Sequence, residues 1–195
     1  MHLDRQNFSV LRSQKKEFNV RGGGGGWFPS VSELLQARER NVPRAPTRQL
    51  TAYLSRNSRV NIIQAYAPTA NSDEEQHDNF HDQAEELVLR QRGYVVVKGD
   101  LNARVGSRKH GEVFIGPHSA EERSEPGERL ASFCELHHLY HGDSQFFKAP
   151  RKRWTLISPN GQHCHEFDHI LCNRKIMTDV AVVPSFNRGS DHRLL

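Results

Sequence analysis

The chain has 195 residues, 35% of them hydrophobic, and its 27 lysines and arginines against 23 acidic residues give a formal net charge of +4. This length is typical of one domain with its own core, and no apolar stretch approaches the roughly 20 residues of a membrane-spanning helix. The N-terminus lacks an apolar signal core, and three scattered cysteines indicate reduced thiols in an intracellular protein and argue against a disulfide framework.

The first half of the chain predicts a strand, a helix and a second strand. Residues 1–21 show no clear pattern, and the glycine run 22–26 lacks the Lys-Ser/Thr of a phosphate-binding loop, so it predicts a loop or loose strand. "VNIIQAYAP", 60–68, predicts a buried strand. The helix that follows begins with a capping-box spacing at Ser72 and Glu75, and one face carries Phe80, Ala84, Leu87 and Val88. "YVVV", 94–97, predicts a strand covered on both faces.

The second half predicts one helix and several short strands. The helix is expected over Pro126–Leu139, with Leu130, Phe133, Cys134 and His137 on one stripe. Strands are expected at "SQFF" (144–147), "RWTLI" (153–157), "EFDHILC" (166–172) and "DVAVV" (179–183), with a turn at "SPNG" (158–161). The mixture predicts an α+β or layered α/β domain with a large sheet component.

Polar side chains stand at, in or just after the predicted strands. Taken singly, each has an ordinary explanation, because Asp and Asn shape turns and Tyr sits at core rims. Taken together, they indicate one hydrolytic rim, since carboxylates and amides bind Mg²⁺ and a histidine oriented by a carboxylate manages a proton. The residues are Tyr66, Asp100, Asn102, Asp168, Asp191 and His192.

Five motifs in order carry a resemblance to a known family: "YAPT", "GDLNARVG", "WTLISPNG", "FDHIL" and "GSDHRLL". Together they resemble the endonuclease/exonuclease/phosphatase family, which includes DNase I and the apurinic/apyrimidinic endonucleases. The chain is most similar to the endonuclease domain of RTE-type non-LTR retrotransposons, and craniofacial-development-protein-like products look similar too. The likeness covers roughly residues 22–195, which leaves 1–21 as a poorly defined segment.

The resemblance implies a four-layered α/β sandwich of two packed β-sheets flanked by helices. It implies a monomer that nicks DNA with Mg²⁺, or Mn²⁺ in its place, and that resides in the nucleus. It also implies roles by position. Tyr66 contacts the scissile phosphate, and Thr155 lies near it. Asp100 orients the attacking water, with Asn102 beside it. Asp168 pairs with the catalytic His192, Asp191 binds the metal, and Ser190 supports these two residues by hydrogen bonding.

One expected residue is missing from the pattern. The family carries a metal-binding Glu, commonly within "QET", and Glu17 and Asn19 lie out of the expected order. We therefore expect weak Mg²⁺ binding and a domain truncated at both ends, and whether these residues form an active enzyme stays open. Two alternatives remain: an inactive relic that binds nucleic acid or a protein partner, and a phosphomonoesterase of the same fold.

A basic cluster at "KAPRKR" provides a candidate DNA contact. Such clusters grip phosphates without reading bases. A solvated surface is the alternative interpretation. The cluster consists of Lys148, Arg151, Lys152 and Arg153.

Histidines give a separate candidate site for zinc. In "HHLYH", His137 and His141 are four residues apart and His138 lies between them, a spacing that can bind zinc, and "HCHEFDH" (163–169) lies nearby. A core-facing role for His137 is the alternative.

Overall fold

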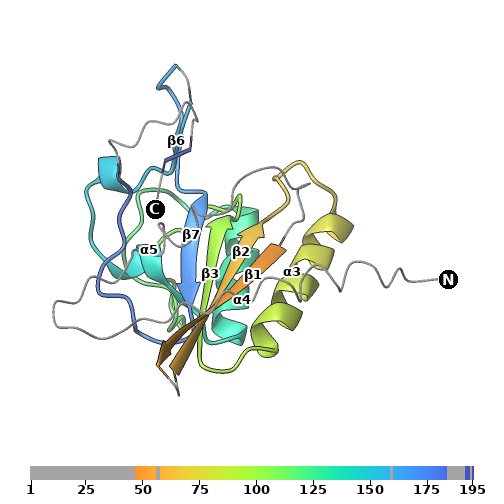
Figure 1. Cartoon of the computed structure of the whole chain (residues 1–195). Coiled ribbons are helices and arrows are strands. Elements are labelled where there is room, and N and C mark those ends of the chain that lie inside the picture. The colour runs from red at the N-terminus through yellow and green to blue at the C-terminus, as the bar shows by residue number, and fades with distance from the viewer. Residues whose placement is uncertain (1–46, 56–57, 159, 184–191, 194) are drawn as a thin grey trace.

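The computed structural model describes residues 47–55, 58–158, 160–183, 192, 193 and 195. A five-stranded sheet has the order β1-β2-β3-β7-β4, and β5 and β6 form a second, two-stranded sheet (Figure 1). The strands are β1 (Thr47–Ser55), β2 (Ser58–Tyr66), β3 (Tyr94–Asp100), β4 (Tyr140–His141), β5 (Leu156–Ile157), β6 (Cys164–His165) and β7 (Asp168–Cys172). The helices are α3 (Glu74–Leu89), α4 (Glu125–Leu136), α5 (Gly142–Gln145) and the 3-10 turn η1 (Pro150–Lys152).

The predicted class, a mixed α/β domain with two β-sheets and flanking helices, is confirmed. The boundary at residues 21 and 22 lies outside the described residues. In the part of the chain that the structure describes, no helix has the length and apolar character needed to cross a membrane. The thiols of Cys134 and Cys172 are buried and that of Cys164 is half-buried, and all three are free.

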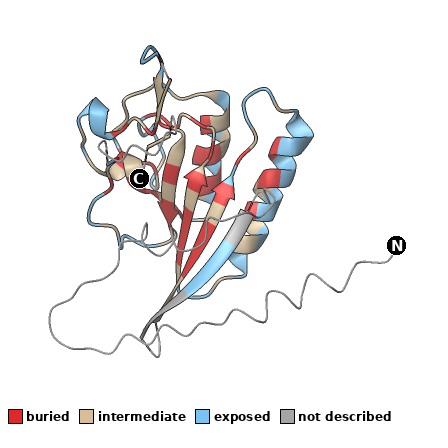
Figure 2. Cartoon of the chain, turned by 45° about the horizontal axis from the view of Figure 1, so that its top comes forward, coloured by how far each residue is buried: buried red, intermediate tan, exposed pale blue. Residues whose placement is uncertain are grey.

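Helices α3 and α4 cover one face of the sheet. Their buried side chains, such as Phe80 and Leu130, form one cluster with Val95 and Val97 of β3. Figure 2 shows the buried stretches of the helices and of the central strands in red. Val96, which points to the other face, is also buried. The prediction that β3 is covered on both faces is therefore confirmed, and the strand lies at the centre of the core.

Helix α3 begins one residue later than the capping box predicts. Asp73 is the N-cap, and its Oδ1 accepts a hydrogen bond from Gln76 N at 2.8 Å. The predicted cap at Ser72 is therefore wrong, because Asp73 supplies the better-placed acceptor. The predicted apolar face is confirmed, since Phe80, Ala84 and Val88 are buried.

The helix predicted over 126–139 ends at Leu136. His138 takes a left-handed conformation with φ 55°, and Leu139 N donates to Cys134 O at 2.9 Å. This arrangement ends a helix by satisfying its last carbonyls. Leu139, which extends the apolar pattern in the sequence, is fully buried beyond that end.

The strand predicted at "SQFF" is wrong: Ser144 and Gln145 end the short helix α5, and Phe146 and Phe147 follow it. The Ser144 hydroxyl donates to His141 O at 2.9 Å and accepts from Gly116 N at 2.7 Å, which fixes a helical turn. Local bonds of this kind compete with strand pairing. "RWTLI" contributes only Leu156–Ile157 as a strand, and residues 179–183 contribute no named strand to either described sheet.

Gly99 allows strands β2 and β3 to approach where the predicted site begins. The two strands run parallel, with Ala65 opposite Gly99 and Tyr66 opposite Asp100. Gly99 has φ 146°, and a Cβ there would lie 1.9 Å from Ala65 O. Only glycine fits this position without moving the backbone.

We expect Gly99→Ala to lower the free energy of unfolding by about 3 kcal/mol or more, because backbone strain and a clash with Ala65 O add. Gly111→Ala is the matched control, since Gly111 has φ 91° with nothing within 4 Å of its Cβ. That control isolates the strain of positive φ, about 1–2 kcal/mol. Urea denaturation measures both, and equal losses would contradict the role assigned to the Ala65 contact.

Candidate functional site

Three of the predicted site residues form one row across the large sheet, at the ends of β2 and β3 and the start of β7. In the parallel pair β2 and β3, Tyr66 lies opposite Asp100. In the antiparallel pair β3 and β7, Asp100 lies opposite Asp168. Residues directly opposite each other project to the same face, so two carboxylates and a phenol converge at this rim.

His192 completes this cluster, which we call the rim site: Tyr66, Asp100, Asp168 and His192. Its backbone forms a bridge with Leu156 of β5. His192 Nδ1 donates to Asp168 Oδ2 at 2.9 Å, and His192 Nε2 lies 3.8 Å from Asp100 Oδ2. The side chains of Asp100, Asp168 and His192 are 14%, 22% and 31% exposed, so all three are partly shielded from solvent.

The surroundings of the Asp100 carboxyl disfavour its ionised form. Burial, and after it the neighbouring charge of Asp168, raise the pKa of Asp100 above its usual range. A hydrogen bond from Asn102 N to Asp100 Oδ1, 3.1 Å long, partly opposes that increase. Two partly desolvated carboxylates beside each other favour a cation or a proton between them.

Asn102 ties the loop after β3 to the end of β2. Its backbone has φ 46°, and its Nδ2 donates to Ala67 O at 2.9 Å. The bond to Asp100 also makes the turn that the ordinary interpretation of Asp-x-Asn predicts. Asn102 therefore forms the turn through its backbone N–H and joins the loop to the residue after β2 through its side chain.

Thr155 positions Asp168 through the backbone. Its buried Oγ1 accepts hydrogen bonds from Phe167 N at 2.9 Å and Asp168 N at 3.0 Å. This hydroxyl thus holds the backbone that carries Asp168 from behind the rim site. Contact between Thr155 and a phosphate stays a prediction.

The donor set at the rim suits a hard divalent cation. Asp100 and Asp168 supply carboxylate oxygens, a ligand type that Mg²⁺ and Mn²⁺ prefer, and Asn102, two residues after Asp100, carries an amide oxygen of the same class. The raised pKa of Asp100 fits this reading, because a cation relieves the repulsion between the two acids. The predicted metal ligand Asp191 and its neighbour Ser190 lie outside the described residues, as do Glu17 and Asn19.

The four predicted DNA-contacting residues fall into different environments. Arg153 is buried, and its Nε and Nη2 bond Glu166 Oε1 and Oε2 at 2.7 and 2.9 Å. Lys148 Nζ bonds Asp179 Oδ2 at 2.8 Å. Arg151 and Lys152 are exposed. The prediction of DNA contact is therefore wrong for Arg153, which is buried in an ion pair. For the exposed Arg151 and Lys152 it stays a prediction.

The predicted zinc histidines do not assemble on one helix, because α4 ends before them. The His137 ring packs against Phe133 and the His138 ring against Phe114. His141 instead contacts His169, with Nε2 and Nδ1 3.0 Å apart. His141 and His169 come from the two histidine-containing segments, "HHLYH" and "HCHEFDH", but sequence reasoning did not identify them as the pair that meets. Burial holds the pKa of His141 well below its ordinary value.

Comparison with known proteins gives two curated relatives. No family model matches the chain. It is similar to craniofacial development protein 2. The Bos taurus protein is 29% identical and the Tragulus javanicus protein 28% identical over 141 residues, which is 70% of this chain and 24% of each relative. The chain thus spans about a quarter of the length of these relatives.

Among solved structures, the chain is similar to a truncated Caenorhabditis elegans TDP2. The match has 13% identity and a TM-score of 0.33, and it covers 64% of this chain and 44% of that one. A TM-score this low does not establish a shared fold.

We expect Asp100→Asn to melt a few degrees above the parent chain at pH 7. A carboxyl whose pKa is raised in the folded state binds its proton more tightly when folded. The free energy of unfolding therefore falls as the pH rises from the ordinary Asp pKa through the raised one, and the loss persists above it. Asparagine removes this loss while its oxygen still accepts the bond from Asn102 N.

Thermal melts at pH 3 and pH 7 measure the effect, which should vanish at pH 3. Asp179→Asn is a control of opposite sign, because the hydrogen bond from Lys148 lowers the pKa of Asp179. The Asp179 variant should lose stability at pH 7 relative to the parent. A Tm gain for Asp100→Asn that is equal at both pH values would contradict the electrostatic origin.

Proposed function

We propose that the protein hydrolyses phosphodiester bonds of DNA with a divalent cation, Mg²⁺ or Mn²⁺, as a nicking endonuclease. The observation that carries the proposal is the rim site, where Asp168 bonds His192 and Asp100 faces the other side of the same ring. The resemblance of the five motifs to the endonuclease/exonuclease/phosphatase family supports it.

Asp168, His192 and Asp100 of the rim site each have a task that their geometry supports. Asp168 accepts the Nδ1–H of His192 and so fixes the tautomer that turns Nε2 towards Asp100. When the ring also carries a proton on Nε2, this N–H stabilises negative charge on the phosphate or gives its proton to the leaving oxygen, and the ring returns to the neutral Nδ1–H form. Asp100 orients the attacking water by accepting one of its protons. A bound divalent cation would supply charge stabilisation on the phosphate, held by Asp100, Asn102 and Asp168.

The origin and cellular setting follow from the same resemblance. The motif order supports descent from the endonuclease domain of an RTE-type retrotransposon, and with it a monomer that acts on nuclear DNA. Arg151 and Lys152 support DNA as the substrate, because they are exposed cations that shortly precede β5, whose Leu156 forms the bridge with His192.

We expect the purified chain to nick supercoiled plasmid in Mg²⁺ and to stop when EDTA is added. His192→Ala should lower the rate by about 100-fold or more, because proton transfer by a positioned side chain contributes that much. His110→Ala is the matched control, since His110 is an exposed histidine in a loop away from the rim residues in sequence. Agarose gels follow the conversion to open circles.

The outcomes separate the competing functions. Nicking that survives His192→Ala would overturn the role of the rim site. A folded chain that binds DNA but leaves the plasmid intact would favour a binding domain without catalysis. Hydrolysis of p-nitrophenyl phosphate, lost in His192→Ala and unaccompanied by nicking, would favour the phosphomonoesterase.

We expect the double variant Arg151→Ala, Lys152→Ala to bind DNA more weakly and with a shallower salt dependence. Each lost phosphate contact reduces the slope of log K against log salt by about 0.9. The matched control removes two charges at Arg174 and Lys175, exposed residues that follow the opposite end of β7. Fluorescence anisotropy over a salt series measures both, and equal slopes in the two variants would contradict the assigned surface.

A further inference from the structure

A second group of metal-ligating side chains lies behind the rim. His141 ends β4, Asp143 is in the first turn of α5, and His169 is in β7. His141 pairs with Leu171, two residues from His169 on the same strand, so the two imidazoles project from one face of the sheet. Asp168, the neighbour of His169, belongs to the rim, and alternation along β7 therefore separates this group from the rim site.

The ligand atoms have nearly the spacing that a tetrahedral ion requires. His141 Nε2 lies 3.0 Å from His169 Nδ1. Asp143 Oδ2 lies 3.8 Å from the first nitrogen and 3.9 Å from the second. An ion about 2.0–2.1 Å from each ligand places the ligands about 3.4 Å apart. Small side-chain rotations, with the histidines moving apart and the carboxylate moving in, bring all three to that distance.

The outward-facing nitrogens are already bonded to acceptors. His169 Nε2 lies 2.7 Å from Ala103 O, a carbonyl that only accepts, so Nε2 carries the proton. His141 Nδ1 lies 2.8 Å from Ser144 Oγ, whose own proton goes to His141 O at 2.9 Å. In this arrangement Nδ1 donates to Ser144. Both inward nitrogens then present lone pairs to each other and to Asp143, as zinc-binding histidines do.

Without a cation, the pair must rearrange its hydrogen bonds. If both rings are neutral and His169 keeps its proton on Nε2, a proton between the rings belongs to His141 Nε2, and His141 Nδ1 becomes an acceptor. The Ser144 proton would then turn from His141 O to the ring, since one hydroxyl proton cannot serve both. With both rings neutral, all of these hydrogen bonds form at once only when a cation stands between the two inward-facing nitrogens.

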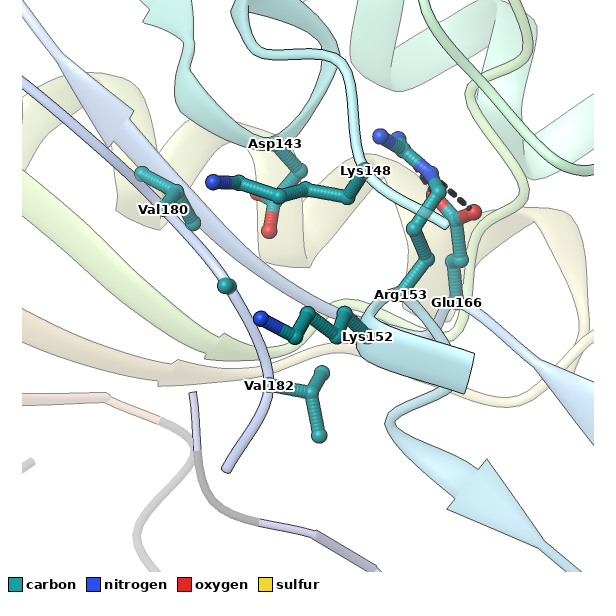
Figure 3. Close-up of a pocket in the computed structure, with 8 residues that line it drawn as sticks. Asp143, Lys148, Lys152, Arg153, Glu166, Val180 and Val182 are labelled. Carbon is teal, nitrogen blue, oxygen red and sulfur yellow. Dashed lines mark hydrogen bonds and ion pairs between the residues drawn. The ribbon is translucent and has the colours of Figure 1, made fainter. Parts of the chain in front are cut away.

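A small cavity gives access on the carboxylate side. It has a volume of about 10 Å³, room for about one water molecule, and Asp143 lines it (Figure 3). Asp143 is 11% exposed, whereas the two histidine side chains are at most 2% exposed. Two of the cations lining this cavity are paired with carboxylates, Arg153 with Glu166 and Lys148 with Asp179.

We propose that His141, Asp143 and His169 bind a divalent transition-metal ion of the zinc class, with water as the fourth ligand. Two imidazoles and a carboxylate suit Zn²⁺ better than Mg²⁺, which prefers oxygen ligands. The ion joins β4, α5 and β7, and through His169 it holds Ala103, which follows Asn102 of the rim. Its role is therefore structural support behind the rim, and it does not depend on the proposed nuclease activity.

Metal analysis of untagged protein tests the proposal. We expect about one zinc per chain after dialysis, and Asp143→Asn or His141→Gln should weaken zinc binding at least about 10-fold. His192→Ala is the matched control, because it removes a histidine of the rim site and should retain zinc. Cobalt exchanged into the parent should give the visible absorption of a tetrahedral site, lost in Asp143→Asn.

A second measurement keeps the test decisive if the variants do not fold. Zn²⁺ should raise the melting temperature of the parent chain, and Mg²⁺ at equal concentration should not, because an ion that binds only the folded state stabilises it. A parent chain without zinc, whose melting temperature Zn²⁺ leaves unchanged, would overturn the proposal. Zinc that is lost in His192→Ala and kept in Asp143→Asn would place the ion at the rim and would overturn it as well.

Discussion

The register of β2, β3 and β7 is the constraint on which the rest of the structure depends. It places Tyr66, Asp100 and Asp168 in one row although they are far apart in sequence. Side chains alternate between faces along a strand, so a slip of one residue in either pair would turn a carboxylate away from the rim. The absent side chain of Gly99 lets Ala65 O lie where it does and thereby makes the row possible.

Strand β7 serves two chemically different environments. Asp168 faces the half-open rim and bonds His192, while its backbone N–H is held by the buried hydroxyl of Thr155. His169 points into the interior, where it contacts His141 and Ala103 O. The rim thus lies against hydrogen-bonded polar groups of the interior. Because these groups hold the backbone of β7, they also fix where Asp168 stands at the rim.

The parts of the structure that follow from local pattern were predictable. The apolar face of α3 and the continuous apolar run of β3 follow from periodicity, and β7 follows from its β-rich segment. The association of Asp168 with His192 came from motif order, since 24 residues separate them in the chain. The cap at Asp73 and the helical turn at Ser144 were missed, because each depends on a hydrogen bond whose geometry composition does not specify.

Residues whose role depends on a distant partner were the least predictable. Arg153 belongs to a cluster of basic residues in the sequence, and nothing in that cluster indicates that Arg153 will form a buried ion pair with Glu166. The pairing of His141 with His169 likewise depends on β4 meeting β7, two short strands 27 residues apart in sequence at closest. Such contacts exist only once the sheet has formed.

The Arg153–Glu166 pair also limits how this sequence can change over evolution. Both side chains are under 10% exposed, and Arg153 also bonds the carbonyls of His118 and Phe146. Loss of either partner leaves a buried charge without its counterion, which costs about 3–5 kcal/mol, whereas replacing both with apolar residues is often tolerated. Homologous sequences should therefore keep both residues or replace both, so positions 153 and 166 should covary.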